Sequence, residues 1–288
     1  MPAYNVAWCI RRAVDSVLAQ DYRAWELIVV NDGSTDDTRA VLESYCGAIT
    51  VIDQPNRGMS AARNAAIRAA RGDYIAFLDA DDWWLPQKLS RQVALLHGRP
   101  EIGFCSTAAR VEDEQGRLLN VWRCCNDGDG MLVRLFAENA AIAGGCSAVM
   151  ARRHLVNEVG LFDETLRGFE DPDLWIRLAA ASGYACIDQA LVGILRRERS
   201  VSRNLAAMRA AAIRSMHKNR MLLPAPMRGG FWRNCLAGVY TDYAKSAYRA
   251  GRTAHAVADT LRALALSPVG RGRLCLGLLR DFLLRRPV

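Results

Sequence analysis

Two spacings of apolar residues alternate along the first part of the chain. Short runs of apolar and β-branched residues have the length of strands, and the segments between them carry apolar or small residues at helical spacing. The pattern predicts strands at 27–30, 49–52 and 74–78 and helices at 7–20, 35–45 and 60–70. Strands that alternate with helices are typical of a doubly wound sheet with parallel neighbours and helices on its faces.

The pattern changes near residue 196, because only helical segments follow. Before that point, strands are predicted at 102–107, 147–151, 185–188 and 192–195, helices at 86–97, 131–139, 153–159 and 171–182, and a hairpin with a loop at 112–130. Later helices are predicted at 204–222, 231–250 with a break near Gly238, 253–265 and 271–286. We therefore predict an α/β domain at 1–202 and a basic helical region at 203–288.

Charge follows the same division. Residues 1–195 carry 19 Lys and Arg against 26 Asp and Glu, whereas residues 196–288 carry 19 against 4. A basic unit favours an anionic partner such as nucleic acid, a membrane surface or a charged substrate; a solvated arginine-rich face is the alternative. The segment 271–286 sets leucines against arginines, which is typical of a helix that lies on a membrane. Packing against the α/β domain is the alternative for that helix.

The composition is that of a globular protein, with 51% hydrophobic and 24% charged residues. The nine cysteines show no paired spacing, and the first residues have no leader pattern. These features predict reduced thiols and a cytoplasmic location. No run of eighteen apolar residues is present to cross a bilayer.

Three carboxylates directly follow the predicted strand at 74–78. They are Asp79, Asp81 and Asp82. Ligands collect at the carboxyl ends of strands in α/β sheets, and two oxygen donors one residue apart can share a divalent cation. Asp79 and Asp81 are therefore predicted to form a metal site. The alternative is a solvated turn that caps the next helix, a role that suits Asp82 because Pro86 follows.

Further candidates stand at other strand and helix ends. Asp32 follows the strand 27–30 and could accept a hydrogen bond from a base or a ribose, or it could cap the next helix. Arg63 is the only charge within a stretch of small residues, so it either faces a diphosphate or lies on the surface. Glu170, Asp171 and Asp173 open a helix, which favours either an ionised general base or helix capping.

Several short motifs occur in a fixed order. They are PAYN at 2–5, SVLAQ at 16–20, NDGSTD at 31–36, NRG at 56–58 with ARN at 62–64, FLDADD at 77–82, and FED at 169–171 with Leu174 and Arg177. Over about residues 2–202 this ordered set resembles the family 2 glycosyltransferases with the GT-A fold. The resemblance implies a Rossmann-like, mixed but mainly parallel sheet flanked by helices, followed here by the helical extension.

The resemblance also implies roles for individual residues. Asp32 would hold the nucleotide base, Arg63 would lie beside the nucleotide, and Pro2, Ala3 and Tyr4 would line its pocket. Asp79 and Asp81 would form the Asp-x-Asp motif that holds Mn²⁺ or Mg²⁺, with Asp79 also contacting the nucleotide-sugar. Asp171 would be the catalytic base, with Glu170 beside it.

Two departures from the family pattern stand out. An apolar strand usually precedes the PAYN turn, and its absence here is expected to expose the sheet beside the nucleotide pocket. In addition, the family often has a histidine in a motif that resembles residues 195–202, whereas this chain has none there. Glu198 is then the candidate for a third metal ligand.

The resemblance implies a hexosyltransferase-type, inverting, metal-dependent enzyme. Its donor would be a nucleotide-diphosphate sugar and its acceptor a glycan or lipid-linked glycan, as in bacterial surface polysaccharide or glycolipid assembly. We expect a cytoplasmic protein, peripheral on the inner face of the membrane through its last helix, with no nucleic-acid partner. The alternatives are an Asp-x-Asp phosphotransferase or phosphatase, and a catalytically inactive nucleic-acid-binding module.

Overall fold

The chain divides into two compact units in the computed structural model, which describes residues 1–124, 130–138, 141–196 and 204–288. The first unit contains Met1–Met131, Ala140–Thr165 and Arg177–Ser200, and the second contains Leu132–Asn139, Leu166–Ile176 and Val201–Val288. Two segments that the sequence analysis assigned to the front domain therefore belong to the second unit.

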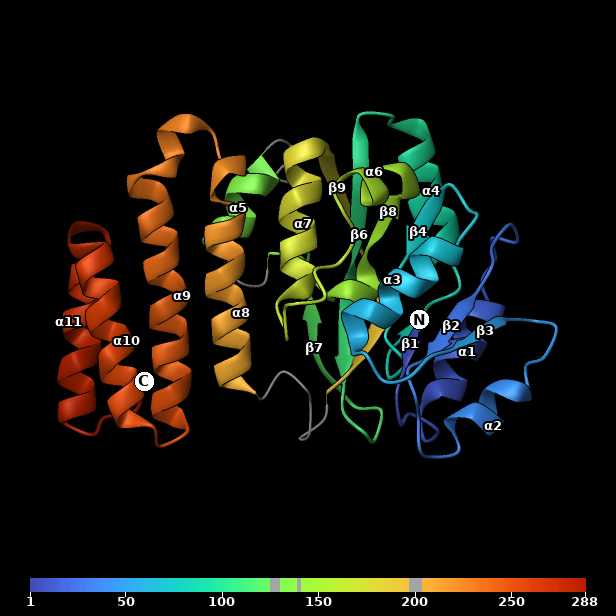
Figure 1. Ribbon diagram of the computed structural model, residues 1–288, viewed down its shortest axis with the longest axis horizontal. Coiled ribbons are helices and arrows are strands. Elements are labelled where there is room, and N and C mark those ends of the chain that lie inside the picture. Colours follow the sequence, from blue (N-terminus) through green and yellow to red (C-terminus); the bar gives the residue numbers. More distant parts are fainter. Residues whose placement is uncertain (125–129, 139–140, 197–203) are drawn as a thin grey trace. The chain divides into compact units, whose positions relative to one another are not determined.

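The first unit begins with a three-stranded parallel sheet (Figure 1). Its strands are β1 Pro2–Ala3, β2 Ile28–Asn31 and β3 Thr50–Asp53, and the helices between and after them are α1 Ile10–Leu18, α2 Thr38–Glu43 and α3 Met59–Ala69. The apolar stripe of α1 is buried as its spacing predicts, at Ile10, Ala13, Val14 and Val17. The order of strands and helices predicted for this part of the chain is confirmed.

The same unit contains a six-stranded mixed sheet. Its path runs β4 Tyr74–Ala76, β8 Met150–Arg152, β6 Ile102–Glu112, β9 Gly183–Leu195 and β5 Trp83–Trp84, and β7 Leu118–Trp122 pairs with β6. β6 and β9 are parallel, and the other neighbours are antiparallel. The helices of this unit that accompany the sheet are α4 Lys88–Gly98 and α6 Arg153–Glu158, whereas most of α5 Met131–Ala137 and of α7 Glu170–Ala181 belongs to the second unit.

β9 corrects one prediction. The sequence suggested separate strands at 185–188 and 192–195, whereas β9 is continuous from Gly183 to Leu195. Its register against β6 shifts beside Thr107 and Ala108, so the polar residues between the two apolar runs remain part of the strand.

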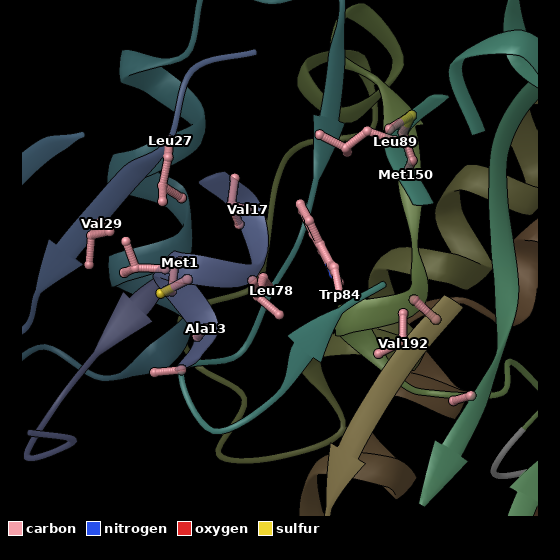
Figure 2. Close-up of a cluster of buried hydrophobic side chains, with 14 of the residues drawn as sticks. Met1, Ala13, Val17, Leu27, Val29, Leu78, Trp84, Leu89, Met150 and Val192 are labelled. Carbon is pink, nitrogen blue, oxygen red and sulfur yellow. The ribbon is translucent and has the colours of Figure 1, made fainter. Parts of the chain in front are cut away.

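The main core of the first unit joins side chains from both sheets (Figure 2). Val17 of α1, Leu27 and Val29 from the first sheet region, and Trp84 and Met150 from the second sheet lie in this one cluster. All of them are less than a tenth exposed. Because this core spans two sheets, it fixes the strand ends that carry the acidic side chains.

An apolar groove lies beside this core. Its volume is about 560 Å³, and its lining includes Met1, residues 26–28 at the start of β2, and residues 74–78 of β4 and its continuation. The groove therefore lies between the start of the chain, β2 and β4.

The second unit consists largely of helices that pack side by side (Figure 1). They are α8 Leu205–Lys218, α9 Gly230–Arg249, α10 Thr253–Leu266 and α11 Pro268–Leu283. The predicted break near Gly238 is wrong, because α9 continues through it. Gly238 instead makes room for Arg271: a Cβ at this position would lie 2.6 Å from a guanidinium nitrogen. None of the helices in the described ranges is long and apolar enough to span a bilayer.

The last helix is amphipathic, but its apolar face is covered within its own unit. Cys275, Leu278 and Phe282 of α11 are buried in contact clusters with α9 and α10. Tyr248 of α9 stacks on Phe282 with ring centroids 4.5 Å apart. Packing against other helices of the second unit therefore accounts for this face.

Candidate active site

The acidic loop after β4 separates its three aspartates by burial. Asp79 and Asp81 are partly exposed, whereas Asp82 is only 6% exposed. The loop turns tightly, because the Asp82 amide donates to the Asp79 carbonyl at 3.1 Å. The Asp81 carbonyl accepts from the Arg12 guanidinium at 3.4 Å. The strand end thus presents two carboxylates at the surface and withdraws the third.

Arg63 lies beside Asp79. The Arg63 guanidinium donates to Asp79 Oδ1 at 2.6 Å, and its carbon lies 5.2 Å from the centre of the Phe162 ring. Arg63 is only 3% exposed, so the surface alternative is wrong. The small residues before it, Ala61 and Ala62, are buried and allow α3 to approach the sheet closely. The structure therefore joins two residues that the sequence analysis selected independently.

Asp82 anchors the loop. Its Oδ2 accepts from Ser147 Oγ at 2.5 Å, and its Oδ1 accepts from the Leu195 amide at 3.3 Å. Burial, followed by the negative charges of Asp79 and Asp81, raises the pKa of Asp82 well above its ordinary value. The predicted solvated cap is therefore wrong for Asp82, because tertiary hydrogen bonds hold its carboxyl group inside the fold.

Asp32 is almost completely buried, at 3% exposed. Its carboxylate accepts from Gln54 Nε2 at 2.6 Å, the Arg57 amide at 2.9 Å and the Gly58 amide at 2.8 Å. Gly58 is the N-cap of α3, so the negative charge lies where the helix dipole favours it. The alternative role is thus corrected: Asp32 holds the start of α3 rather than capping the next helix. Its contact with a base stays a prediction.

The turn at the start of the chain is joined to the same strand end. The Asp32 amide donates to the Ala3 carbonyl at 2.8 Å, and Pro2 pairs with Val30. Tyr4 is 49% exposed next to Asn5, whose φ of +53° lies in the left-handed region. The structure thus brings Pro2, Ala3 and Asp32 together, while Tyr4 remains open to a ligand.

The donor set suits a divalent cation bound together with phosphates. Asp79 and Asp81 supply hard oxygen donors, and Mg²⁺ typically takes one or two carboxylates plus substrate phosphate oxygens. Within the described ranges, no group of three or more His, Cys, Asp or Glu residues is arranged to hold a metal by itself. Asp79 and Asp81 could therefore supply part of the ligand set of such a cation. Glu198, the predicted third ligand, lies outside the described residues.

The acids at the start of α7 have different surroundings. Glu170 is buried and Asp171 is partly exposed. Phe169, immediately before them, has a φ of +60°, a strained conformation for a bulky side chain that occurs at functional sites. Gly168 also has a positive φ, of +96°. The chain therefore enters α7 through a constrained turn that sets the direction of both acids.

Asp173 has a structural role instead. It is fully buried and accepts from Ser215 Oγ at 3.0 Å, Lys218 Nζ at 2.9 Å and Asn219 Nδ2 at 2.8 Å. These contacts join α7 to α8 within the second unit. Asp173 therefore binds α8 and the residue that follows it through its carboxylate, a role that its position at the start of α7 does not indicate.

Sequence reasoning missed three residues around the acidic loop. Ser147 bonds Asp82, Trp84 donates from Nε1 to the Ser147 carbonyl at 2.9 Å, and Lys88 is completely buried. Trp84 and Lys88 stand close to the acids in the sequence, but nothing local indicates their burial. Ser147 is 65 residues from Asp82, and no short motif connects them.

A match to a protein-family model decides to which family the chain belongs. The model of glycosyl transferase family 2 matches residues 1–158, more than half of the chain. The chain belongs to glycosyl transferase family 2. This family 2 chain is 32% identical, over 187 residues, to an uncharacterized glycosyltransferase of Rickettsia prowazekii, covering 63% of this chain and 58% of the relative. It thus spans a little over half the length of the curated relatives it matches first.

A shorter match links the chain to a named enzyme. It is 42% identical over 98 residues to the Escherichia coli UDP-Glc:alpha-D-GlcNAc-diphosphoundecaprenol beta-1,3-glucosyltransferase WfgD, which covers 33% of this chain and 39% of WfgD. The family match favours neither the phosphotransferase nor the nucleic-acid-binding alternative.

Solved structures show the same fold. Staphylococcus aureus TarS 1-349, crystallised in complex with UDP-GlcNAc, matches with a TM-score of 0.61 and 17% identity over 92% of this chain and 89% of TarS 1-349. The mannosyltransferase PcManGT from Pyrobaculum calidifontis, in complex with GDP-Man and Mn²⁺, matches with a TM-score of 0.62 and 20% identity over 97% of this chain and 78% of PcManGT. The GT-A fold expected from the resemblance is confirmed.

Proposed function

We propose that this family 2 protein transfers a sugar from a nucleotide-diphosphate sugar to an acceptor hydroxyl, with inversion at the anomeric carbon. The observation that carries the proposal is the ion pair at 2.6 Å between buried Arg63 and partly exposed Asp79, in the same loop as a second carboxylate, Asp81. A guanidinium and two acids at one strand end provide what a diphosphate and its cation require. WfgD, whose name includes the donor UDP-Glc, and PcManGT, whose structure contains GDP-Man, support this donor class.

The proposed roles follow from these positions. Asp79 and Asp81 hold Mn²⁺ or Mg²⁺, which when bound neutralises charge on the leaving diphosphate. Arg63 donates hydrogen bonds beside the diphosphate, and its burial keeps its orientation fixed. Pro2, Ala3 and Tyr4 line the nucleotide pocket, with Asp32 recognising the base at the adjoining strand end.

Asp171 is the proposed general base, with Glu170 beside it. Its carboxylate takes the proton of the acceptor hydroxyl as that oxygen attacks the anomeric carbon. The bond to the diphosphate breaks on the opposite side, so one displacement inverts the configuration. The strained backbone at Phe169 supports this assignment, because it fixes the position of the base before the substrate binds.

Thermal shift measurements test the donor site. We expect Mn²⁺ together with one member of a panel of UDP-, GDP- and dTDP-sugars to raise the melting temperature. Asp81→Ala should abolish the metal-dependent part of that shift. Asp188→Ala, which removes an exposed carboxylate that pairs with Arg123, should preserve it. A metal-dependent shift that survives Asp81→Ala would refute the metal site.

The acceptor proposed is a glycan or lipid-linked glycan in surface polysaccharide or glycolipid assembly. WfgD supports it, because its name describes a diphosphoundecaprenol acceptor. The protein would act in the cytoplasm, peripheral on the membrane surface. Support comes from the outer face of α11, where exposed arginines and apolar residues share one stripe: Val269, Arg273, Leu276, Arg280 and Leu283. Such a stripe can bury apolar side chains among lipids while its arginines reach phosphates.

Vesicle sedimentation tests the membrane proposal. The protein should sediment with phosphatidylglycerol-containing vesicles, and deletion of residues 268–288 should abolish this. Because deletion also removes buried Leu278 and Phe282, the sharper variant is the double reversal Arg273→Glu with Arg280→Glu. The matched control is the double reversal of exposed Arg214 and Arg233 on α8 and α9. Equal sedimentation of both double variants would refute a specific role for α11.

A further inference from the structure

One buried hydroxyl connects the two ends of the acidic loop. Ser147 Oγ accepts a hydrogen bond from the Asp79 amide at 3.0 Å and donates one to Asp82 Oδ2 at 2.5 Å. Ser147 is completely buried. A single side chain thus fixes the main chain at the first aspartate and the carboxyl group of the last.

The main chain around Ser147 is itself held tightly. Residues 146–148 form a 3₁₀ turn entered through Gly144 and Gly145, both with positive φ. A Cβ on Gly144 would lie 2.8 Å from that of Ala148, so only glycine allows this close approach. The Ala148 carbonyl accepts from Gln92 Nε2 at 2.9 Å. The turn is therefore a rigid support for the serine hydroxyl.

Trp84 secures the other side of the loop against the same turn. Its indole Nε1 donates to the Ser147 carbonyl at 2.9 Å, and its amide donates to Ser16 Oγ at 3.0 Å. Residues 79–84 are consequently attached to Ser147 at both ends. Between the attachment points, Asp79 and Asp81 remain partly exposed.

We propose that Ser147 is a positioning residue, which holds the loop 79–82 in the shape that lets Asp79 and Asp81 share one cation with the donor diphosphate. The inference rests on the proposed function, and it assigns to Ser147 no direct contact with the substrate. Loss of the hydroxyl would free the Asp79 amide and leave the buried Asp82 carboxyl group without its shortest hydrogen bond. Both changes would loosen the spacing between the two ligands.

The test compares nucleotide affinity with and without Mn²⁺ by calorimetry, using the nucleoside diphosphate whose sugar gives the largest thermal shift. Ser147→Ala should weaken the Mn²⁺-dependent affinity by about 10- to 100-fold, the range typical when a group that orients metal ligands is removed. Affinity without Mn²⁺ should stay within about twofold. The control is Ser106→Ala, which removes an equally buried hydroxyl. That hydroxyl is hydrogen-bonded to the Tyr184 hydroxyl at 2.6 Å and not to a residue of the loop 79–82.

A double-mutant cycle isolates the hydrogen bond itself. Because Ser147 and Asp82 share one hydrogen bond, Ser147→Ala with Asp82→Ala should cost less Mn²⁺-dependent affinity than the sum of the two single substitutions. Additive losses would overturn the proposal, as would an equal loss with and without Mn²⁺. If Ser147→Ala does not fold, Trp84→Phe tests the proposal instead. This variant removes only the indole donor to the Ser147 carbonyl and should lower the Mn²⁺-dependent nucleotide affinity. An unchanged affinity would overturn the proposal.

The unmodified chain separates two kinds of failure. If it binds no nucleotide in an Mn²⁺-dependent way, the proposed function fails and the role of Ser147 fails with it. If it binds and Ser147→Ala binds equally well, only the role of Ser147 is overturned.

Discussion

Lys88 is a completely buried basic side chain, and it offers a quantitative test of the structure. It lies at the start of α4. Its Nζ has no hydrogen-bond partner among the described residues and lies 4.0 Å from the centre of the Trp84 ring. We predict that Lys88→Met stabilises the first unit, and that the gain depends on pH.

The magnitude follows from the pKa. Burial lowers the pKa of Lys88 from 10.5 to about 7, with the nearby thiols of Cys105 and Cys146 opposing the change weakly. Each pKa unit corresponds to about 1.4 kcal/mol, so the full penalty for burying the ammonium is about 5 kcal/mol. Burial also raises the pKa of Cys105 to about 12, so that thiol stays neutral across the range tested.

The sign determines the pH window. Between about pH 7 and 10.5 the unfolded chain holds a proton on Lys88 that the folded chain has lost, so stability rises with pH in this range. The penalty is complete below pH 7 and disappears above 10.5. The stabilisation by Lys88→Met should therefore fall from about 5 kcal/mol at pH 6 to about 2 kcal/mol at pH 9.

Urea unfolding followed by tryptophan fluorescence measures this difference at each pH. Subtracting the free energy of unfolding of the unmodified chain from that of the variant cancels the contributions of the other titrating groups. A suitable control is Lys245→Met, since Lys245 is a partly exposed lysine of α9, and its effect should be small and independent of pH. A gain from Lys88→Met that is the same at pH 6 and pH 9 would refute the reasoning, because it would show an amine of ordinary pKa.

Three further substitutions have expected outcomes. Arg63→Lys, which replaces the planar fork beside Asp79, should lower nucleotide affinity in the presence of Mn²⁺ by about tenfold in calorimetry; unchanged affinity would contradict its role. Asp259→Ala leaves two arginines of the helical unit without their buried carboxylate and should cost about 3 kcal/mol in urea unfolding of that unit, leaving nucleotide affinity unchanged. Gly238→Ala, with its Cβ in the space of Arg271, should lower stability by about 1–3 kcal/mol, whereas Gly229→Ala meets nothing within 4 Å and should cost less.

The strands and helices of the front part were predictable because their signals are local. Residues 27–30 and 74–78 are apolar runs bounded by acids, and β2 and β4 lie within a residue or two of those positions. The break predicted at Gly238 failed for the opposite reason. The intrinsic cost of a helical glycine is only about 1 kcal/mol, and the room it provides for Arg271 outweighs it.

The candidate site was only partly predictable. Asp79, Asp81, Arg63 and Asp32 follow strands or interrupt a stretch of small residues, so their unusual positions were visible in the sequence. That Arg63 pairs with Asp79 was not, because the two lie on different elements, 16 residues apart. Burial of a charged group is decided by what packs around it, and this information is not carried by neighbouring residues.

By itself, the sequence determined which segments form strands and helices, which acids stand at strand ends, and to which family the motifs belong. Only the tertiary structure decided that Asp82 turns inward to Ser147, that Asp173 binds α8, and that α11 covers its apolar face within its own unit. The physical reason is distance along the chain. Local spacing determines secondary structure, whereas these contacts join residues tens of positions apart and exist only once both segments are packed.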